Sequence, residues 1–440
     1  MKHSTPTSPH SCKVEEAFDL PGLTPMAGLS LLIDFLRQRL GLRSTLETVN
    51  LRKAPWARYQ LADELEVLLV GYLAGSERIG HMEELRHDPL VGRKLGLKRL
   101  PDPTTLYRTL DRFDSRPKVG ELERVHRQLL RQLLPSDQAI VVDLDTTVQT
   151  VHGRQEGSSV GYNPRYPGRR SYQPLLAFEG STGLLVHLQL RPGTTPSGEE
   201  QAAFWRRTRQ QLPPGVRPRF VRADRGFGSE AFVSALEEDG VGYVVKIRLD
   251  ARLEGCIRQG LVWKRLFSED PAVEMEAASV AFRLRHDAPL RRVVLVRTRP
   301  LEEPAQRVLF EEDRWDYEAM VTNLPWDEED VWRFYNRRCA SENRVKELKG
   351  GMHARAISKA RFWANAADLW LKAMAYNVLL AFQRLAPAAY QRFSLQRFRR
   401  ALIRLPGRLV RHARRWRLRL PRGWPHERAW WHLRAQLHPT

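Results

Sequence analysis

Residues 140–147 read Ile140-Val141-Val142-Asp143-Leu144-Asp145-Thr146-Thr147, and this stretch decides the fold that the rest of the chain completes. An apolar run that ends in acids is typical of a buried strand whose carboxyl end reaches the edge of a sheet. A second run, Arg219-Phe220-Val221-Arg222-Ala223-Asp224, ends in the same way. Other strands are predicted at 172–178, 184–190 and 243–247, and helices at 197–211 and 229–239. This order predicts an α/β fold, a mixed sheet flanked by helices.

Outward from this core the pattern changes several times. Between residues 22 and 135, apolar residues recur at spacings of three and four residues, which predicts a helical region. After residue 248 come β-like pieces rich in acids, and then a helix over 327–349 that Gly350 and Gly351 end. The predicted parts are a loose tail (1–21), a helical region (22–135), a core in two pieces (136–248 and 316–388), a β-rich insertion between them (249–315) and a basic C-terminal helical tail rich in Arg and Trp (389–440).

The charge of the chain points to a polyanionic partner. Its 440 residues hold 72 Lys and Arg against 51 Asp and Glu, a formal net charge of +21. Such an excess favours nucleic acid, although a GC-rich genome alone also raises the Arg content. No apolar run reaches the roughly 18 residues of a membrane helix, so a membrane partner is excluded. Three cysteines without a CxxC spacing argue against a zinc site or a disulfide framework.

Carboxylates are the strongest candidates for chemistry. Asp145 and Asp224 each end a predicted strand, where acids either cap turns or bind a cation. On an unbroken helix over 327–349, Tyr335, Arg338, Glu342 and Lys349 fall within one 60° stripe, and Lys346 lies beside it at 20°. An acid aligned with two cations and a phenol does not suit a hydrophobic core, but it suits a metal ligand flanked by phosphate-binding groups. The alternative, a solvated helix face, explains the charges but not their alignment.

These residues resemble a known family. The spacing Y-x2-R-x3-E-x6-K, met by Tyr335, Arg338, Glu342 and Lys349, is similar to the YREK signature of DDE transposases from bacterial insertion sequences. The segments 142–156 and 222–227 resemble the first and second Asp segments of that superfamily, and 321–325 resembles the strand before its Glu helix. The segment 161–176 is most similar to the insertion-sequence 1380 family. The resemblance covers residues 139–385, and more weakly 22–115.

The resemblance implies an RNase H-like catalytic core in which Asp145, Asp224 and Glu342 hold two Mg²⁺ ions, with Mn²⁺ able to substitute. Water would cut the phosphodiester at the transposon end, and the freed 3′-OH would attack target DNA. Tyr335, Arg338 and Lys349 would grip phosphates, and Lys346 lies close enough to join them. Asp143 lies two residues before Asp145 and therefore faces the same side of the strand, so it remains an alternative first metal ligand. Trp263 or Trp315 is expected either to hold a flipped base or to be an ordinary core residue.

The expected partners are the terminal inverted repeats of the transposon and target DNA, bound by a homodimer in a synaptic complex of the bacterial cytoplasm and nucleoid. The helical region 22–135 is the candidate reader of the repeats, and the Arg-rich tail suits phosphate contacts, with Trp able to stack on bases. The main hypothesis is cut-and-paste transposition. Two alternatives stay open: a catalytically inactive DNA-binding descendant, and a metal-dependent nuclease without strand transfer.

Overall fold

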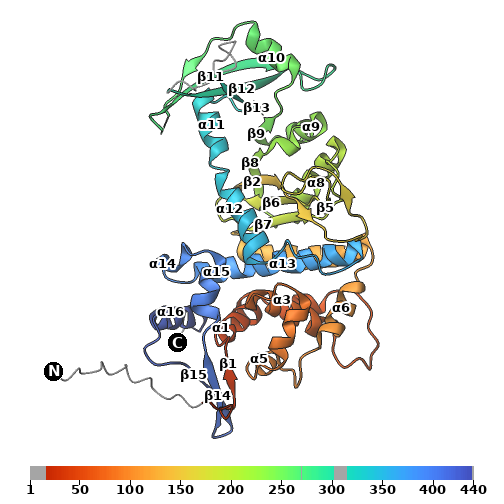
Figure 1. The fold of residues 1–440 in the computed structure, drawn as a ribbon, viewed down its shortest axis with the longest axis vertical. Helices are drawn as coiled ribbons and strands as arrows, with labels where there is room; N and C mark the ends of the chain where they lie inside the picture. Colours follow the sequence, from red (N-terminus) through yellow and green to blue (C-terminus); the bar gives the residue numbers. More distant parts are fainter. Residues whose placement is uncertain (1–15, 269, 302–314, 439–440) are drawn as a thin grey trace, which may run out of the picture.

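A nine-stranded mixed sheet forms the centre of the computed structural model, which describes residues 16–268, 270–301 and 315–438 (Figure 1). The strand order is β10-β11-β12-β13-β9-β8-β2-β6-β7. The strands are β2 (Ala139–Thr146), β6 (Leu175–Glu179), β7 (Leu185–Gln189), β8 (Arg217–Ala223), β9 (Gly242–Ile247), β10 (Lys264–Arg265), β11 (Val273–Phe282), β12 (Arg291–Pro300) and β13 (Asp316–Thr322). The predicted mixed sheet with flanking helices is therefore present.

The strand directions place the carboxyl ends of β2 and β8 side by side. β8 runs parallel to both β2 and β9, whereas the other neighbours in this sheet are antiparallel. Asp143 pairs with Arg222 and Leu144 with Ala223, so Asp145 and Asp224 follow at the same edge. A small sheet of β3 (Gln149–Thr150), β5 (Arg170–Tyr172) and β4 (Ser159–Val160) lies in the loop after β2.

The β-rich segment predicted at 249–315 is part of this sheet. β11 and β12 are ten residues each, pair along their whole length, and continue through β13 to β9. Ladder hydrogen bonds across these strands extend the sheet, so the segment is no separate module in its described residues. Helix α10 (Ala251–Arg258) lies at this end of the molecule (Figure 1).

Helices cover the sheet and continue beyond it. α8 (Gly198–Gln211) contacts β7 and α9 (Glu230–Glu238), and each of these two helices begins at a serine whose hydroxyl accepts a backbone N–H. α11 (Glu328–Asn336) packs on β11 and β12, and α12 (Cys339–Lys346) with the π-helical turn η5 (Glu347–Gly351) follows it toward α13 (Phe362–Arg384). Figure 1 shows α13 crossing the molecule between the sheet and the N-terminal helices.

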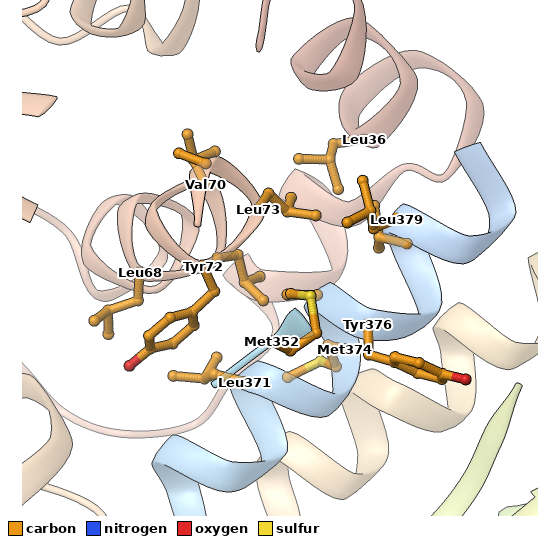
Figure 2. Close-up of a cluster of buried hydrophobic side chains, with 14 of the residues drawn as sticks. Leu36, Leu68, Val70, Tyr72, Leu73, Met352, Leu371, Met374, Tyr376 and Leu379 are labelled. Carbon is orange, nitrogen blue, oxygen red and sulfur yellow. The ribbon is translucent and has the colours of Figure 1, made fainter. Parts of the chain in front are cut away.

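Helix α13 packs against both the N-terminal helices and the sheet, so the two parts share one core. Eighteen of its 23 residues are buried, and α3 (Leu61–Ala74) packs along it through hydrophobic side chains, several of which Figure 2 shows. Its buried Lys372 lies 3.0 Å from Asp368, which accepts a hydrogen bond from Tyr72 of α3. The other N-terminal helices are α1 (Leu29–Asp34), the π-helical η1 (Phe35–Arg39), α2 (Leu42–Glu47), η2 (Ile79–Met82), α4 (Glu83–Arg86), α5 (Val91–Leu95), α6 (Pro103–Asp111) and α7 (Arg116–Leu133).

The C-terminal part differs from the helical tail that the sequence predicted. Short helices α14 (Ala388–Gln391), α15 (Leu395–Phe398) and the π-helical η6 (Arg399–Ile403) lead into two strands, β14 (Gly407–His412) and β15 (Arg415–Arg419), before α16 (Glu427–Leu437). The prediction of helix is wrong for 407–419, because alternating residues there satisfy a strand pair. β1 (Leu23–Thr24) pairs with β14, so both ends of the described chain meet in one sheet. The predicted loose tail 1–21 lies mostly outside the described residues, and 16–20 are irregular and exposed.

Two buried histidines make the fold sensitive to acid. His126 of α7 and His187 of β7 are fully buried around Trp370, and burial lowers the pKa of His126 to about 3. In the unfolded chain its pKa is about 6.5. Because the unfolded state then binds the proton more tightly, stability that is present above about pH 6.5 is lost as the pH falls toward 3.

We expect His126→Gln to weaken this pH dependence. Glutamine has no proton to gain and its Oε1 can accept the hydrogen bond that Asn377 Nδ2 donates to His126 Nε2. Between pH 6 and 4 the slope of the unfolding free energy against pH should fall by about 1.4 kcal/mol per pH unit, one proton less. Urea unfolding at a series of pH values measures it. An unchanged slope would show that His126 is protonated in the folded protein.

Candidate active site

Asp145 and Asp224 face each other where β2 and β8 end. Asp145 is 8% exposed, and its Oδ1 accepts the Thr146 backbone N–H at 2.8 Å. The Thr146 hydroxyl donates to Asp224 Oδ2 at 3.4 Å, and Asp224 Oδ1 accepts the Gly226 N–H at 3.0 Å. The parallel register of β2 and β8 brings the two carboxylates to the same edge of the sheet. The sequence predicted both acids at the ends of strands.

Arg338 lies between the two carboxylates. Its Nη2 is 3.1 Å from Asp145 Oδ2 and 3.9 Å from Asp224 Oδ2, and it also donates to the Leu144 carbonyl at 2.8 Å. Burial raises the pKa of Asp145 to about 7, the Arg338 charge opposes that rise and the Asp224 charge adds to it. The strand ends therefore form an acidic pair whose charge needs a cation, and in this structure the guanidinium supplies it.

Tyr335 and Lys349 border the same pair. Tyr335 is 7% exposed, and burial raises the pKa of its hydroxyl, with Asp224 and Asp145 near enough to add to the effect. Lys349 Nζ donates to Thr147 Oγ1 at 2.9 Å and to the Val148 carbonyl at 3.0 Å. Burial lowers the pKa of Lys349, and Asp145 counteracts this. Three of the four residues of the predicted stripe thus surround the strand ends.

Glu342 is not among them. It is exposed on α12, and it forms no hydrogen bond or ion pair with the described residues; Lys346 is exposed on the same helix. Across the described part of the chain, no three His, Cys, Asp or Glu side chains lie close enough together to hold a metal ion. The structure therefore brings two of the three predicted acids together and leaves the third apart.

The predicted continuous helix 327–349 is wrong, and this explains the position of Glu342. α11 ends at Asn336 and α12 begins at Cys339, and the Arg338 N–H bonds to the Tyr335 carbonyl three residues back. The last turn before Gly351 is a wider π-helix. A rotation of 100° per residue holds only along an unbroken α-helix, so helix periodicity does not predict which residues past this break face the acids. Lys349 lies beside them and Glu342 does not.

Asp143, the alternative first ligand, is fully buried and its oxygens are occupied. Arg222 reaches both of them, at 2.7 and 3.0 Å, and Arg344 reaches one at 2.9 Å. Arg222 sits directly opposite Asp143 in the ladder, so strand pairing was the signal in the sequence for this partner. The partnership with Arg344 depends on how α12 folds and had no such signal.

Trp263 and Trp315 lie away from the strand-end acids, beside β10–β13. The Arg297 guanidinium lies over both rings, 4.1 Å from the centre of Trp263 and 4.2 Å from that of Trp315. Trp315 is 8% exposed and also carries Arg299 on its ring. Stacking on arginine accounts for both tryptophans in this structure, and their role toward a base stays a prediction.

The comparisons with known proteins agree with the class of enzyme that this site suggests. The family described as "Transposase DDE domain group 1" matches residues 7–440, and the chain belongs to that family. No curated protein matches the chain by sequence.

Two solved structures are similar. The piggyBac transposase synaptic complex with hairpin DNA is 13% identical, with a TM-score of 0.42, 87% of this chain covered and 81% of that chain. The Drosophila P element transposase strand transfer complex is 14% identical, with a TM-score of 0.24 and coverage of 47% and 42%. Among the described residues, no helix is long and apolar enough to cross a membrane.

Asp143 and Asp145, two residues apart, should respond differently to loss of charge. Asp143→Asn removes the buried anion that faces the buried Arg222 and should lower the free energy of unfolding by about 3–5 kcal/mol. Asp145→Asn should change it by no more than about 1 kcal/mol, because burial already disfavours that charge. Urea unfolding of both variants with a chelator present measures this. Equal losses would contradict the structural role of Asp143.

Proposed function

We propose that this transposase cuts the DNA at the ends of its element and joins the freed 3′-OH to target DNA, with Asp145 and Asp224 as its catalytic carboxylates. The observation that carries the proposal is the meeting of these two acids at neighbouring strand ends, beside Arg338 and Lys349. Membership of the DDE transposase family and a net charge of +21 support DNA as the substrate. The antiparallel β2-β6-β7 set with parallel β8 and β9 is the arrangement we assign to an RNase H-like core.

The donor set fits Mg²⁺ in part. Asp145 and Asp224 offer the oxygen ligands that Mg²⁺ or Mn²⁺ prefers, and they already surround a positive charge. Glu342 becomes a third ligand only if α12 turns, and the break between α11 and α12 is the place where it can do so. When bound, two such ions would activate the attacking oxygen and stabilise the leaving one.

The chain's own side chains have complementary roles in this proposal. Arg338 offsets one of the two negative charges of the acidic pair and so reduces the repulsion that a phosphate meets there. Lys349 is held beside the acids by its bonds to Thr147 and Val148, and Tyr335 is buried near them on α11. Lys346, exposed on α12, is placed to contact DNA outside the site. A homodimer that pairs both ends of the element completes the proposal for cut-and-paste transposition.

The test uses purified protein, a linear duplex carrying the element's own ends, a target plasmid and Mg²⁺. Wild type should excise the element and join it to the plasmid. Asp145→Asn and Asp224→Asn should each lower the cleavage rate at least about a hundredfold while end binding persists. The matched control is Asp287→Asn, which removes an exposed carboxylate between β11 and β12, and this variant should cut normally.

The outcomes separate the alternatives. Cleavage without joining would favour the nuclease, and binding without cleavage in either Mg²⁺ or Mn²⁺ would favour the inactive DNA-binding protein. Full activity of both Asn variants would contradict the assignment of Asp145 and Asp224.

Glu342→Gln tests the third acid independently. If α12 brings Glu342 to the strand ends during the reaction, this variant should bind end DNA as wild type does and cut it at least about a hundredfold more slowly. Lys346→Gln on the same helix is its control, with weaker binding at high salt and near-normal cutting of bound DNA. Normal cutting by Glu342→Gln would show that Glu342 is no ligand.

A further inference from the structure

The β14–β15 hairpin is a two-stranded ribbon for most of its length. β1 pairs only with Gly407 and Arg408 at its base, and the ladder then continues between β14 and β15 alone to the pair His412–Arg415. Ala413 and Arg414 form the two-residue turn, both at positive φ (46° and 63°). Figure 1 shows the hairpin at the end of the molecule opposite β11, β12 and β13, on the other side of α13 from β2 and β8.

One face of this ribbon is almost entirely basic. Residues directly opposite each other in an antiparallel pair share a face, and the face alternates along each strand. The register therefore gathers on one face Arg408, Arg415, Arg417 and Arg419 with His412, and Val410 as the one apolar side chain. Arg415, Arg417 and Arg419 are exposed, and Arg414 at the turn and Arg422 beyond β15 extend the charge.

Within the residues that the structure describes, no acidic side chain pairs with these arginines. No Asp or Glu occurs between residues 392 and 426. In the described chain, none of the hairpin arginines forms an ion pair, whereas Arg222 and Arg344 in the core are held by Asp143. The register even places Arg408 opposite Arg419, and like charges across a ladder destabilise it. A polyanion outside the chain would relieve this repulsion.

The opposite face holds the ribbon in place. Leu409 is 8% exposed and Leu418 packs against the N-terminal core. Arg93 of α5 lies over the Trp416 ring, 4.0 Å from its centre. The basic face is thus presented by a hairpin whose other face is anchored, so little conformational entropy is lost when a ligand binds it.

We propose that the basic face of β14–β15 binds duplex DNA at the transposon end, in the interior of the repeat away from the cleaved bond. This inference rests on the proposed function and adds the element that grips the DNA. A two-stranded ribbon fits the roughly 12 Å wide major groove, and its guanidinium groups match phosphates and guanine edges as bidentate donors. Because α13 lies between the hairpin and the strands β2 and β8, whose ends carry the two acids, the hairpin is expected to contact the duplex away from the cut.

The experiment measures binding to a 40-base-pair duplex that carries the element's end, over a series of salt concentrations, by fluorescence anisotropy. Arg415→Ala, Arg417→Ala and Arg419→Ala are combined in one variant. It should raise Kd about 10- to 100-fold at 0.15 M salt and lower the slope of log K against log salt by about 2–3. Hydroxyl-radical footprinting should lose protection inside the repeat and keep it at the cleaved end.

Two matched variants control for charge and for folding. Arg248→Ala, Arg258→Ala and Arg265→Ala together remove the same charge from exposed arginines at the other end of the molecule, and should change Kd less than about threefold. Replacing Arg415, Arg417 and Arg419 with Lys should restore the salt slope. If the Lys variant binds as poorly as the Ala variant, the loss comes from a damaged hairpin and the proposal is overturned.

The outcomes also distinguish this proposal from the proposed function. If wild type binds and cuts the end duplex and the hairpin Ala variant does so equally well, only the hairpin proposal fails. An equal loss in the control variant, or a loss confined to single-stranded probes, overturns it too. If wild type neither binds nor cuts the end duplex, the proposed function itself fails.

Discussion

The structure depends on one buried carboxylate. Asp143 lies in the middle of the sheet with no exposed surface, and it is held there by Arg222 from the next strand and Arg344 from α12. A charge buried this deeply is tolerated only when paired, so the register of β2 on β8 and the docking of α12 are fixed together. That register brings Asp145 and Asp224, two residues further along the chain from Asp143 and Arg222, to the same edge. The buried Asp143 thereby positions the two acids that we propose as catalytic.

Much of this arrangement was predictable because a strand can be recognised from the local pattern of apolar and polar residues. Short apolar runs that end in acids gave β2 and β8, and parallel strand ends share an edge, so the meeting of Asp145 and Asp224 followed from the residues themselves. The helix after β13 was predictable in type and place, but its internal geometry was not. The stripe of Tyr335, Arg338, Glu342 and Lys349 assumed an unbroken helix, whereas Arg338 turns into the acidic pair and the helix breaks beside it.

The C-terminal hairpin was missed although its signal was present. Arg415-Trp416-Arg417-Leu418-Arg419 alternates with a period of two, the period of a strand, but one of its two faces is charged rather than apolar. A search for strands with a buried apolar face overlooks such a ribbon, because its basic face packs against nothing in the described chain. The N-terminal helices, the C-terminal strands and α13 share one core, so the ribbon is rigidly joined to the part of the molecule that carries the acids.

We propose that Asp145 and Asp224 form the metal-binding catalytic centre, and one cleavage experiment tests this directly. Fe²⁺ in place of Mg²⁺, with ascorbate and hydrogen peroxide, generates hydroxyl radicals that cut the polypeptide near the bound ion. With end DNA present, we expect cuts close to residues 145 and 224, which Mg²⁺ suppresses and Asp145→Asn abolishes. Cuts elsewhere, or an unchanged pattern in Asp145→Asn, would show that the metal ion binds at another place.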